Sequence, residues 1–385
     1  MNKILHGDCL EILKTLEENS VDSIVTDPPY ELGFMGKSWD NTGIANNPLM
    51  WAECLRVLKP GGYLLSFGGT RTYHRMAVAI EDAGFEVRDM IEWVYGSGFP
   101  KSLNIGKAVD KLQGNEREEF ENKNGSATGS IVTTGSGNLK RVFMDSKGTS
   151  EWEGWGTALK PAHEPICMAR KPLAEKTVAE NVLKYGTGGI NIDESRLDAL
   201  PRKTGTKPTS DEATGSGSSL QGSSKNRQAE YDELNLGRFP ANLINDNSEE
   251  VRECFPETKT GAVTQKAESV NSEYAFSHNM ITHTKERLAD SGNASRFFKS
   301  IIYQAKASKS NRGEGNTHAT VKPTALMEYL INMVSREGQI ILDPFGGSGT
   351  TGVACKNINR NYILIEKEQE YIDIINARLS TPSSS

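Results

Sequence analysis

Two stretches at opposite ends of the chain decide the expected fold: Ser23-Ile24-Val25-Thr26-Asp27-Pro28-Pro29-Tyr30 and Ile341-Leu342-Asp343-Pro344-Phe345-Gly346-Gly347-Ser348-Gly349-Thr350. Each begins with a short apolar run that is typical of a buried strand. Each then continues into an acidic residue and a tight loop. Because open α/β sheets bind ligands at the carboxyl ends of their strands, we expect these two distant strand ends to fold together into one site.

Strand and helix patterns alternate around both stretches. Apolar runs predict strands over 22–26, 63–67, 85–95, 165–170, 339–342 and 362–365. Helical spacing, ended by Gly or Pro at several positions, predicts helices over 9–16, 49–58, 72–83, 325–335, 350–357 and 368–379. This alternation predicts an α/β fold with a doubly wound, mostly parallel sheet.

The composition limits the classes of function. With 385 residues and a net charge of −6, the chain is large enough for a sizeable core, but its charge argues against a general polyanion binder. The five cysteines are scattered and form no CxxC pair, so we expect reduced thiols and no metal site. No apolar stretch is long enough for a membrane span, and no export signal is seen at the start, so we expect a cytoplasmic protein without membrane contact.

The Asp27-Pro28-Pro29-Tyr30 segment is suited to binding a planar amine. The two prolines fix φ and remove two backbone donors, so the loop can present Asp27 and the Pro28 carbonyl outward. An amine attached to an aromatic ring is a poor nucleophile, and accepting its two N–H bonds would favour a more nucleophilic nitrogen. Tyr30 could stack on the ring. The alternative is an ordinary proline-rich turn after a strand.

The glycine loop after Asp343 indicates a cofactor without a pyrophosphate. Glycines allow a backbone to approach a ligand closely. The loop lacks the last glycine of a dinucleotide fingerprint and the Gly-Lys-Ser/Thr of a phosphate loop. Glu366 ends the next expected strand, where acidic residues commonly bind ribose hydroxyls, although an exposed strand-end charge is the alternative.

Two further segments give weaker signals. Asp8, which precedes Cys9, could accept a hydrogen bond from an adenine amine or cap the following helix, and both roles are compatible. Residues 316–323 contain His318, Thr320 and Lys322, which could meet a carboxylate or form a polar connector.

Together these residues resemble the β-ordered amino DNA methyltransferases that use S-adenosylmethionine, in which the catalytic tetrapeptide precedes the cofactor loop. The resemblance covers residues 3–100 and 318–379, with a weaker likeness over 158–166. The segments 152–156 and 295–298 are similar to phage- and prophage-borne members. The resemblance implies a Rossmann-like methyltransferase sheet with an irregular target-recognition insert.

The resemblance also implies roles for individual residues. Asp27, Pro28, Pro29 and Tyr30 would be catalytic. Three of the residues implied to bind the cofactor, His318, Thr320 and Lys322, would lie near its methionine end. The full set of implied cofactor-binding residues is Asp8, Cys9, Asp27, His318, Thr320, Lys322, Asp343, Pro344, Phe345, Gly346, Gly347, Ser348, Gly349, Thr350 and Glu366.

The expected organisation follows from these assignments. Residues 1–100 would form the catalytic half, 101–160 a flexible Gly/Ser-rich region, and 161–172 a returning strand. Residues 173–315 would form the target-recognition insert, 316–380 the cofactor-binding half, and 381–385 a tail.

The expected reaction is a direct displacement on the exocyclic amine of a base flipped out of double-stranded DNA. In the family that the chain resembles, Asp at the first position of the tetrapeptide is commoner with adenine and Ser with cytosine. The resemblance therefore favours adenine N6 and leaves cytosine N4 open. Since no cysteine lies in a Pro-Cys motif, a covalent route through a ring carbon is not expected.

A basic stripe in the insert is the expected DNA contact. Arg296, Lys299, Lys306, Lys309 and Arg312 interleave with aromatic residues and enclose no acidic residue, a pattern that fits phosphate contact and base stacking. A solvated face of an ordinary element is the alternative.

Parts of the sequence are also compatible with other functions. An RNA or protein amine methyltransferase would have a similar catalytic loop, and a catalytically silent DNA-binding regulator could share the scaffold. A nicotinamide oxidoreductase is disfavoured by the glycine spacing. A homodimer is common in the resembling group, and the sequence leaves open whether a restriction endonuclease accompanies the protein.

Overall fold

The computed structural model describes most of the chain. The described residues are 2–32, 42–98, 102–121, 130–132, 142–197, 202–205, 231–234, 237–261, 263–266, 284–287, 290–301, 316 and 321–380. They divide into two compact units, one comprising residues 1–96 and 163–385 and the other residues 97–162.

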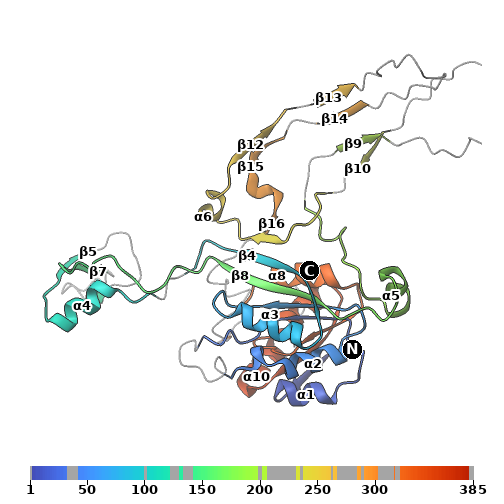
Figure 1. Cartoon of the computed structure of the whole chain (residues 1–385), viewed down its shortest axis with the longest axis horizontal. Helices are drawn as coiled ribbons and strands as arrows, with labels where there is room; N and C mark the ends of the chain where they lie inside the picture. Colours follow the sequence, from blue (N-terminus) through green and yellow to red (C-terminus); the bar gives the residue numbers. More distant parts are fainter. Residues whose placement is uncertain are drawn as a thin grey trace, which may run out of the picture. The chain divides into compact units, whose positions relative to one another are not determined.

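The larger unit is built on a nine-stranded sheet with the order β1-β18-β17-β2-β3-β8-β4-β11-β16 (Figure 1). Within this sheet β8 alone is antiparallel to its neighbours β3 and β4. The strands are β1 (Lys3–His6), β2 (Ser23–Thr26), β3 (Tyr63–Phe67), β4 (Glu86–Val94), β8 (His163–Arg170), β11 (Leu243–Asn245), β16 (Lys299–Ser300), β17 (Ile340–Asp343) and β18 (Asn361–Glu366).

Helices cover both faces of this sheet. One core cluster joins α1 (Cys9–Thr15), α2 (Pro48–Val57) and α3 (Tyr73–Asp82) to strand residues such as Ile24. The other joins α8 (Thr324–Val334), α9 (Thr350–Asn357) and α10 (Gln369–Ser380) to strand residues such as Val25. Because neighbouring strand residues point to opposite faces, this arrangement confirms the predicted doubly wound, mostly parallel fold.

The two stretches that predicted the fold lie side by side. Strands β2 and β17 pair in parallel, with Ser23 opposite Ile341 and Ile24 opposite Leu342. Their carboxyl ends therefore reach the same edge of the sheet. The prediction that these two strand ends meet is confirmed.

The structure differs from the sequence-based prediction at the ends of the sheet. Strand β1 was not predicted, and β11 and β16 extend the sheet beyond β4, so part of range 173–315 belongs to the sheet. Strands of two to four residues are too short to show a hydrophobic period. The remaining elements of this unit are η3 (Ile44–Asn46), α5 (Val178–Tyr185), β9 (Arg202–Gly205), β10 (Tyr231–Leu234), α6 (Glu249–Arg252), β12 (Glu257–Thr260), β13 (Val263–Lys266), β14 (Thr284–Arg287), β15 (Asp290–Asn293) and η4 (Ala294–Phe297).

The smaller unit contains regular structure where the composition predicted loops. It holds α4 (Ile105–Gln113), β5 (Glu118–Glu121), β6 (Ser130–Val132) and β7 (Val142–Lys147), with β7 central in an antiparallel sheet. Arg117 forms ion pairs with the buried carboxylate of Asp110 and with Glu153. This ion cluster connects α4 to the residue that precedes β5.

No helix in the described part of the chain is long and apolar enough to cross a membrane.

Candidate functional site

A hydrogen bond joins the two strand ends. The Thr26 hydroxyl donates to Asp343 Oδ1 at 2.6 Å, and the Phe345 amide donates to the same oxygen at 3.1 Å. The Thr351 hydroxyl donates to Asp343 Oδ2 at 2.6 Å. Asp343 is 3% exposed, and its burial raises the pKa of this carboxyl to about 6. Asp343 therefore holds the loop that follows it to strand β2 and to helix α9.

That loop turns around a second carboxyl group. Gly347 and Gly349 have φ values of 51° and 80°, which favour glycine. The Gly347 amide donates to Glu366 Oε2 at 2.7 Å, at the carboxyl end of β18. Burial raises the pKa of Glu366. The predicted loop residues and Glu366 thus lie together, with the Pro344 ring buried and Phe345 half-buried.

An arginine from the last helix braces the same loop. Arg378 Nη1 donates to the Ser348 hydroxyl and to the Thr350 hydroxyl, each at 3.1 Å, and also to the Ser348 carbonyl. Its burial lowers the pKa of the guanidinium to about 10. Arg378 was not predicted as a site residue from the sequence, since a basic residue in the last turn of a helix is an ordinary feature.

The turn after β1 lies beside this loop. The Gly7 amide donates to the Glu366 carbonyl at 2.9 Å. Asp8 caps α1, because its Oδ1 accepts from the Leu10 amide at 3.0 Å, which confirms the capping prediction. Cys9 is buried, and burial raises the pKa of its thiol to about 12, so this side chain carries no thiolate at neutral pH.

A compact cluster of charges surrounds Asp27. Lys322 Nζ donates to Asp27 Oδ2 at 2.8 Å and to the Tyr30 hydroxyl at 3.0 Å, and lies 3.1 Å from Glu164 Oε2. It also lies 4.8 Å from the centre of the Phe67 ring. Burial acts to lower the pKa of Lys322, but Asp27 and Glu164 hold it above its ordinary value. Lys322 therefore contacts the tetrapeptide that was predicted to be catalytic. His318 and Thr320 lie outside the described residues.

The second oxygen of Asp27 differs from the first. Asp27 Oδ1 is buried and has no hydrogen-bond partner among the described residues. A buried oxygen without a donor is costly to the fold, and functional sites are where such costs are commonly kept. This atom is therefore a buried acceptor that no described residue occupies.

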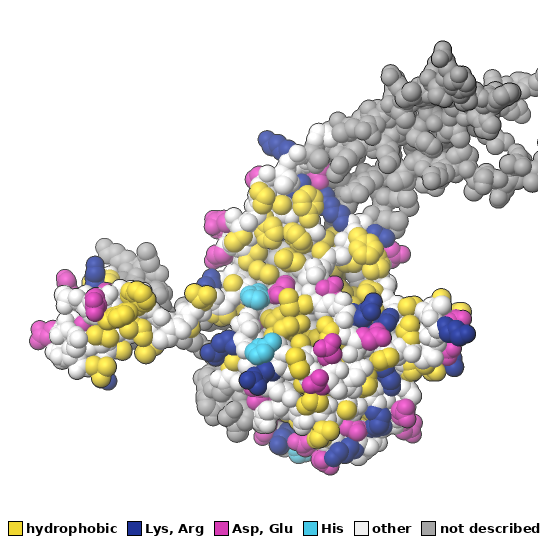
Figure 2. Space-filling view, viewed as in Figure 1, with side chains coloured by type: hydrophobic (Ala, Val, Ile, Leu, Met, Phe, Trp, Pro, Cys, Tyr) yellow, Lys and Arg dark blue, Asp and Glu magenta, His cyan; other side chains and the backbone are white. Residues whose placement is uncertain are grey.

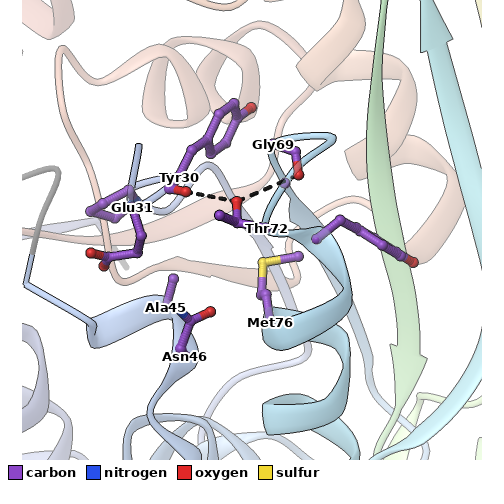
Figure 3. A pocket seen from close by; sticks show the side chains of 10 residues that line it. Tyr30, Glu31, Ala45, Asn46, Gly69, Thr72 and Met76 are labelled. Atoms are coloured by element: carbon purple, nitrogen blue, oxygen red, sulfur yellow. Dashed lines mark hydrogen bonds between the residues drawn. The ribbon is translucent and has the colours of Figure 1, made fainter. Parts of the chain in front are cut away.

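The tetrapeptide is fixed on the side of Tyr30 as well. The Thr72 hydroxyl donates to the Tyr30 carbonyl at 2.7 Å and also contacts the Gly69 carbonyl, as Figure 3 shows. A Cβ at Gly69 would lie 3.2 Å from Tyr30 Cβ, so glycine permits a close approach that a larger residue would crowd. Pro29 and Tyr30 line a small hollow here, while Pro28 is buried.

The tyrosine hydroxyl is part of the charge cluster. Tyr30 donates to Glu164 Oε2 at 3.2 Å. Burial, together with the charges of Asp27 and Glu164, raises the pKa of Tyr30 well above its ordinary value. The hydroxyl therefore stays protonated, and the ring is held by its own hydrogen bond.

The predicted basic stripe is engaged with protein groups where the structure describes it. The Arg296 guanidinium lies 3.4 Å from Asp290 and 4.5 Å from the Phe297 ring centre. The Lys299 ammonium lies 4.8 Å from the centre of the Tyr329 ring. On the face drawn in Figure 2, basic and acidic side chains are interspersed. Lys306, Lys309 and Arg312 lie outside the described residues.

Several residues of the cluster were not singled out from the sequence. Glu164 lies within the weakly similar range 158–166, and Thr72 and Tyr95 gave no motif. The place of Glu164 and Tyr95 depends on how β8 pairs with β4, and short-range patterns do not encode that pairing.

Known proteins with similar sequences cover almost the whole chain. The chain is 22% identical over 419 residues to the type II methyltransferase M.HindIII of Haemophilus influenzae, covering 98% of this chain and 94% of that protein. It is 24% identical over 387 residues to the type II methyltransferase M.HpaI of Haemophilus parainfluenzae, covering 98% and 74%. A structural comparison with the cytosine-N4-specific PvuII DNA methyltransferase gives a TM-score of 0.46 at 16% identity, covering 100% and 89%.

A family model supplies the assignment. The model of the N6/N4 methyltransferases, described as DNA methylase, matches residues 21–377 and so spans both strand ends and everything between them. The chain belongs to this family of N6/N4 DNA methylases.

Proposed function

We propose that this chain transfers a methyl group from S-adenosylmethionine to the exocyclic amine of a base in double-stranded DNA, and that the base is adenine, methylated at N6. The observation that carries the proposal is the buried Asp27 Oδ1, which lacks a donor among the residues that the structure describes. An exocyclic amine supplies the missing N–H, and an aromatic base supplies a face for the tyrosine ring.

The glycine loop and its neighbours fit the methyl donor. S-adenosylmethionine, when bound, supplies an electrophilic methyl group and presents ribose hydroxyls without a phosphate. Glu366 Oε2 accepts the Gly347 amide and keeps acceptor capacity for a hydroxyl. A Cβ at Gly346 would lie 3.2 Å from the Ile365 carbonyl, so the loop is packed at its base without side chains. We propose that Glu366 and residues 344–350 bind the donor, with Asp8 and Cys9 beside them.

Asp343 has a different proposed role in the same region. Both of its oxygens already accept hydrogen bonds within the chain. We therefore propose that it acts by holding the loop in place. For the methionine end of the donor, we propose the predicted residues Lys322, His318 and Thr320. Lys322 also contacts Asp27.

The chain's own groups account for activation of the amine. Asp27 Oδ1 accepts one N–H of the amine, which favours a pyramidal nitrogen whose lone pair can attack. Lys322 holds Oδ2, so the carboxylate does not rotate. Asp27 need not be a strong base, because a methylated arylammonium is very acidic. Positioning and charge stabilisation supply most of the acceleration.

The target base must leave the helix to reach Asp27. Flipping costs a few kcal/mol of stacking and pairing, and stacking on Tyr30 offsets part of that cost. Fluorescence of 2-aminopurine at the target position should rise when the protein binds. An active enzyme with unchanged fluorescence would argue against flipping.

Target recognition is proposed for the segment between the two halves. Residues 173–315, apart from β11 and β16, are the region we propose to read the sequence, with phosphate contacts from Lys306, Lys309 and Arg312. We further propose a cytoplasmic enzyme that acts as a homodimer, which light scattering of the purified protein would check.

The test of the function is methyl transfer to defined substrates. Tritium transfer from labelled donor is measured with duplex DNA, RNA and protein, and the modified DNA is digested and analysed by mass spectrometry. We expect label in duplex DNA, recovered as N6-methyladenine. If the label is recovered as N4-methylcytosine, the target base is cytosine and not adenine. If the label appears only in RNA or protein, the proposal is overturned.

A further inference from the structure

Glu164 reaches the Asp27 cluster from a different part of the sheet. It lies on β8, and its side chain is 21% exposed. Its Oε2 accepts from the Tyr30 hydroxyl at 3.2 Å and lies 3.1 Å from Lys322 Nζ. Its Oε1 accepts from the Tyr95 hydroxyl at 3.5 Å. One carboxylate thus connects β8, the loop after β2 and the segment that precedes α8.

Three oxygens surround the Lys322 ammonium. Lys322 Nζ donates to Asp27 Oδ2 at 2.8 Å and to the Tyr30 hydroxyl at 3.0 Å, and it forms an ion pair with Glu164 Oε2 at 3.1 Å. The charge of Glu164 therefore attracts the ammonium from the side away from Asp27, and no hydrogen bond joins Lys322 to Asp27 Oδ1. That oxygen is the buried one without a partner among the described residues.

Without the Glu164 carboxylate, this balance changes. An uncharged side chain at position 164 attracts the ammonium less strongly, and the closest buried oxygen without a partner among the described residues is Asp27 Oδ1. A side chain that is only 12% exposed has little water to turn to, so sharing the ammonium between both Asp27 oxygens becomes favourable. Asp27 would then lose its free acceptor.

The net charge of the cluster also supports a role for Glu164. Asp27 and Glu164 surround a single ammonium, so the cluster carries a net charge of −1. A cationic methyl donor is better accommodated beside a negative cluster than beside a neutral one.

We infer that Glu164 is a positioning residue for methyl transfer: it holds Lys322 on Oδ2 of Asp27 so that Oδ1 stays available to the target amine. This inference rests on the proposed function for its kinetic consequences. The arrangement of Lys322 itself can be observed without turnover.

The titration of Lys322 gives the inference a distinctive signature. The titratable groups around it are Asp27 and Tyr30 after β2, Glu164 on β8, Tyr95 after β4 and, behind Asp27, Asp343 on β17. Since Asp27 and Glu164 keep the pKa of Lys322 above its ordinary value, neutralising Glu164 lowers it. Loss of activity at high pH should then begin at a lower pH.

The experiment compares Glu164→Gln with a matched control, Glu92→Gln. Glu92 lies on β4, is 25% exposed and pairs with His163 instead of Lys322. For Glu164→Gln we expect kcat to fall about 10–100-fold, as for outer-shell partners of catalytic groups, with the donor Kd changed less than about threefold. The alkaline limb of its pH–kcat profile should move to lower pH. Glu92→Gln should keep the wild-type kcat and profile.

A second readout uses the unliganded protein. The ¹⁵N ammonium signal of Lys322, assigned by its loss in Lys322→Arg, should exchange slowly with water in the wild type and faster in Glu164→Gln. This signal distinguishes a failure of the proposed function from a failure of the role inferred for Glu164. A protein that shows it but methylates no DNA overturns the proposed function, whereas an unchanged signal in Glu164→Gln overturns the role of Glu164.

Kinetics provide the remaining criteria. Wild-type kcat and pH profile in Glu164→Gln would overturn the inference, as would a loss of activity that only follows a loss of folded protein. If Glu164→Gln does not fold, Glu164→Asp keeps the charge and shortens the reach. It should fold, lose part of kcat and keep the wild-type alkaline limb, and full activity in this variant would contradict the inference.

Discussion

Thr26 and Asp343, 317 residues apart in the chain, share a buried hydrogen bond of 2.6 Å. Each residue ends a strand, and each is followed by one of the two loops of the site. The bond therefore fixes the start of the Asp27 loop against the start of the glycine loop. It is a direct side-chain connection between the half of the chain that would bind the amine and the half that would bind the methyl donor.

Removing this connection should loosen both loops. Thr26→Val keeps the shape and leaves Asp343 Oδ1 with the Phe345 amide alone. We expect the free energy of unfolding to fall by about 1–2 kcal/mol and donor affinity to weaken, measured by denaturant unfolding and calorimetry. Ser23→Ala on the same strand is the control, because the Ser23 hydroxyl is buried without a partner among the described residues and its loss should cost nothing. Equal effects of the two substitutions would contradict this role of Thr26.

The stability of the chain should depend on pH through Asp343. Its pKa is about 6 in the folded chain and 3.8 ordinarily. A carboxyl with a raised folded pKa holds its proton more tightly in the fold, so its contribution to stability is full below pH 3.8 and is lost as the pH rises through about 6. The loss amounts to about 3 kcal/mol. Unfolding curves of wild type and Asp343→Asn across this range should converge or cross as the pH rises, and parallel curves would show that Asp343 does not titrate this way.

Arg378 should matter for donor binding more than for chemistry. Arg378→Met removes the donors to Ser348 and Thr350 but keeps an apolar stem against the loop. We expect donor Kd to rise about tenfold, equivalent to 1.4 kcal/mol, with kcat at saturating donor little changed. Asn376→Ala, at an exposed position of the same helix, is the control. A fall in kcat with an unaltered donor Kd would contradict the role of Arg378 in donor binding.

Charge reversal in the insert should affect DNA alone. Changing Lys306 and Lys309 together to Glu should raise the KM for DNA and make it less sensitive to salt, because phosphate contacts are lost. Donor affinity should be unchanged, which calorimetry without DNA would check. An unchanged KM would remove these residues from the proposed DNA contact.

The sequence predicted the central strands and helices well. Strand 63–67 and helix 350–357 were predicted at the observed bounds, since a buried apolar run between glycines and a helix after a glycine loop are strong local signals. Strand β1 is short and only partly buried, and β16 has two residues. Such strands form because a neighbouring strand offers hydrogen bonds, which no local pattern reveals.

The site could be predicted only in part for a related reason. Asp27 and Tyr30 follow a strand, and Asp343 and Glu366 each end one. The position of a strand end in a parallel sheet is predictable. Glu164 lies within an antiparallel strand, and its contact with Lys322 depends on the register of β8. From the sequence, Arg296 was predicted to contact DNA phosphates, yet the structure places it next to Asp290. A run of basic residues does not show which of their side chains face the protein.

The most direct test of the account is Asp27→Ala, with methyl transfer to duplex DNA and donor affinity measured on the same preparation. Because Asp27 Oδ1 is the proposed acceptor for the amine, we predict that turnover is abolished while donor Kd stays within about threefold, a change worth less than 1 kcal/mol. Turnover that persists, or turnover and donor binding lost together, would contradict the claim that Asp27 acts on the amine.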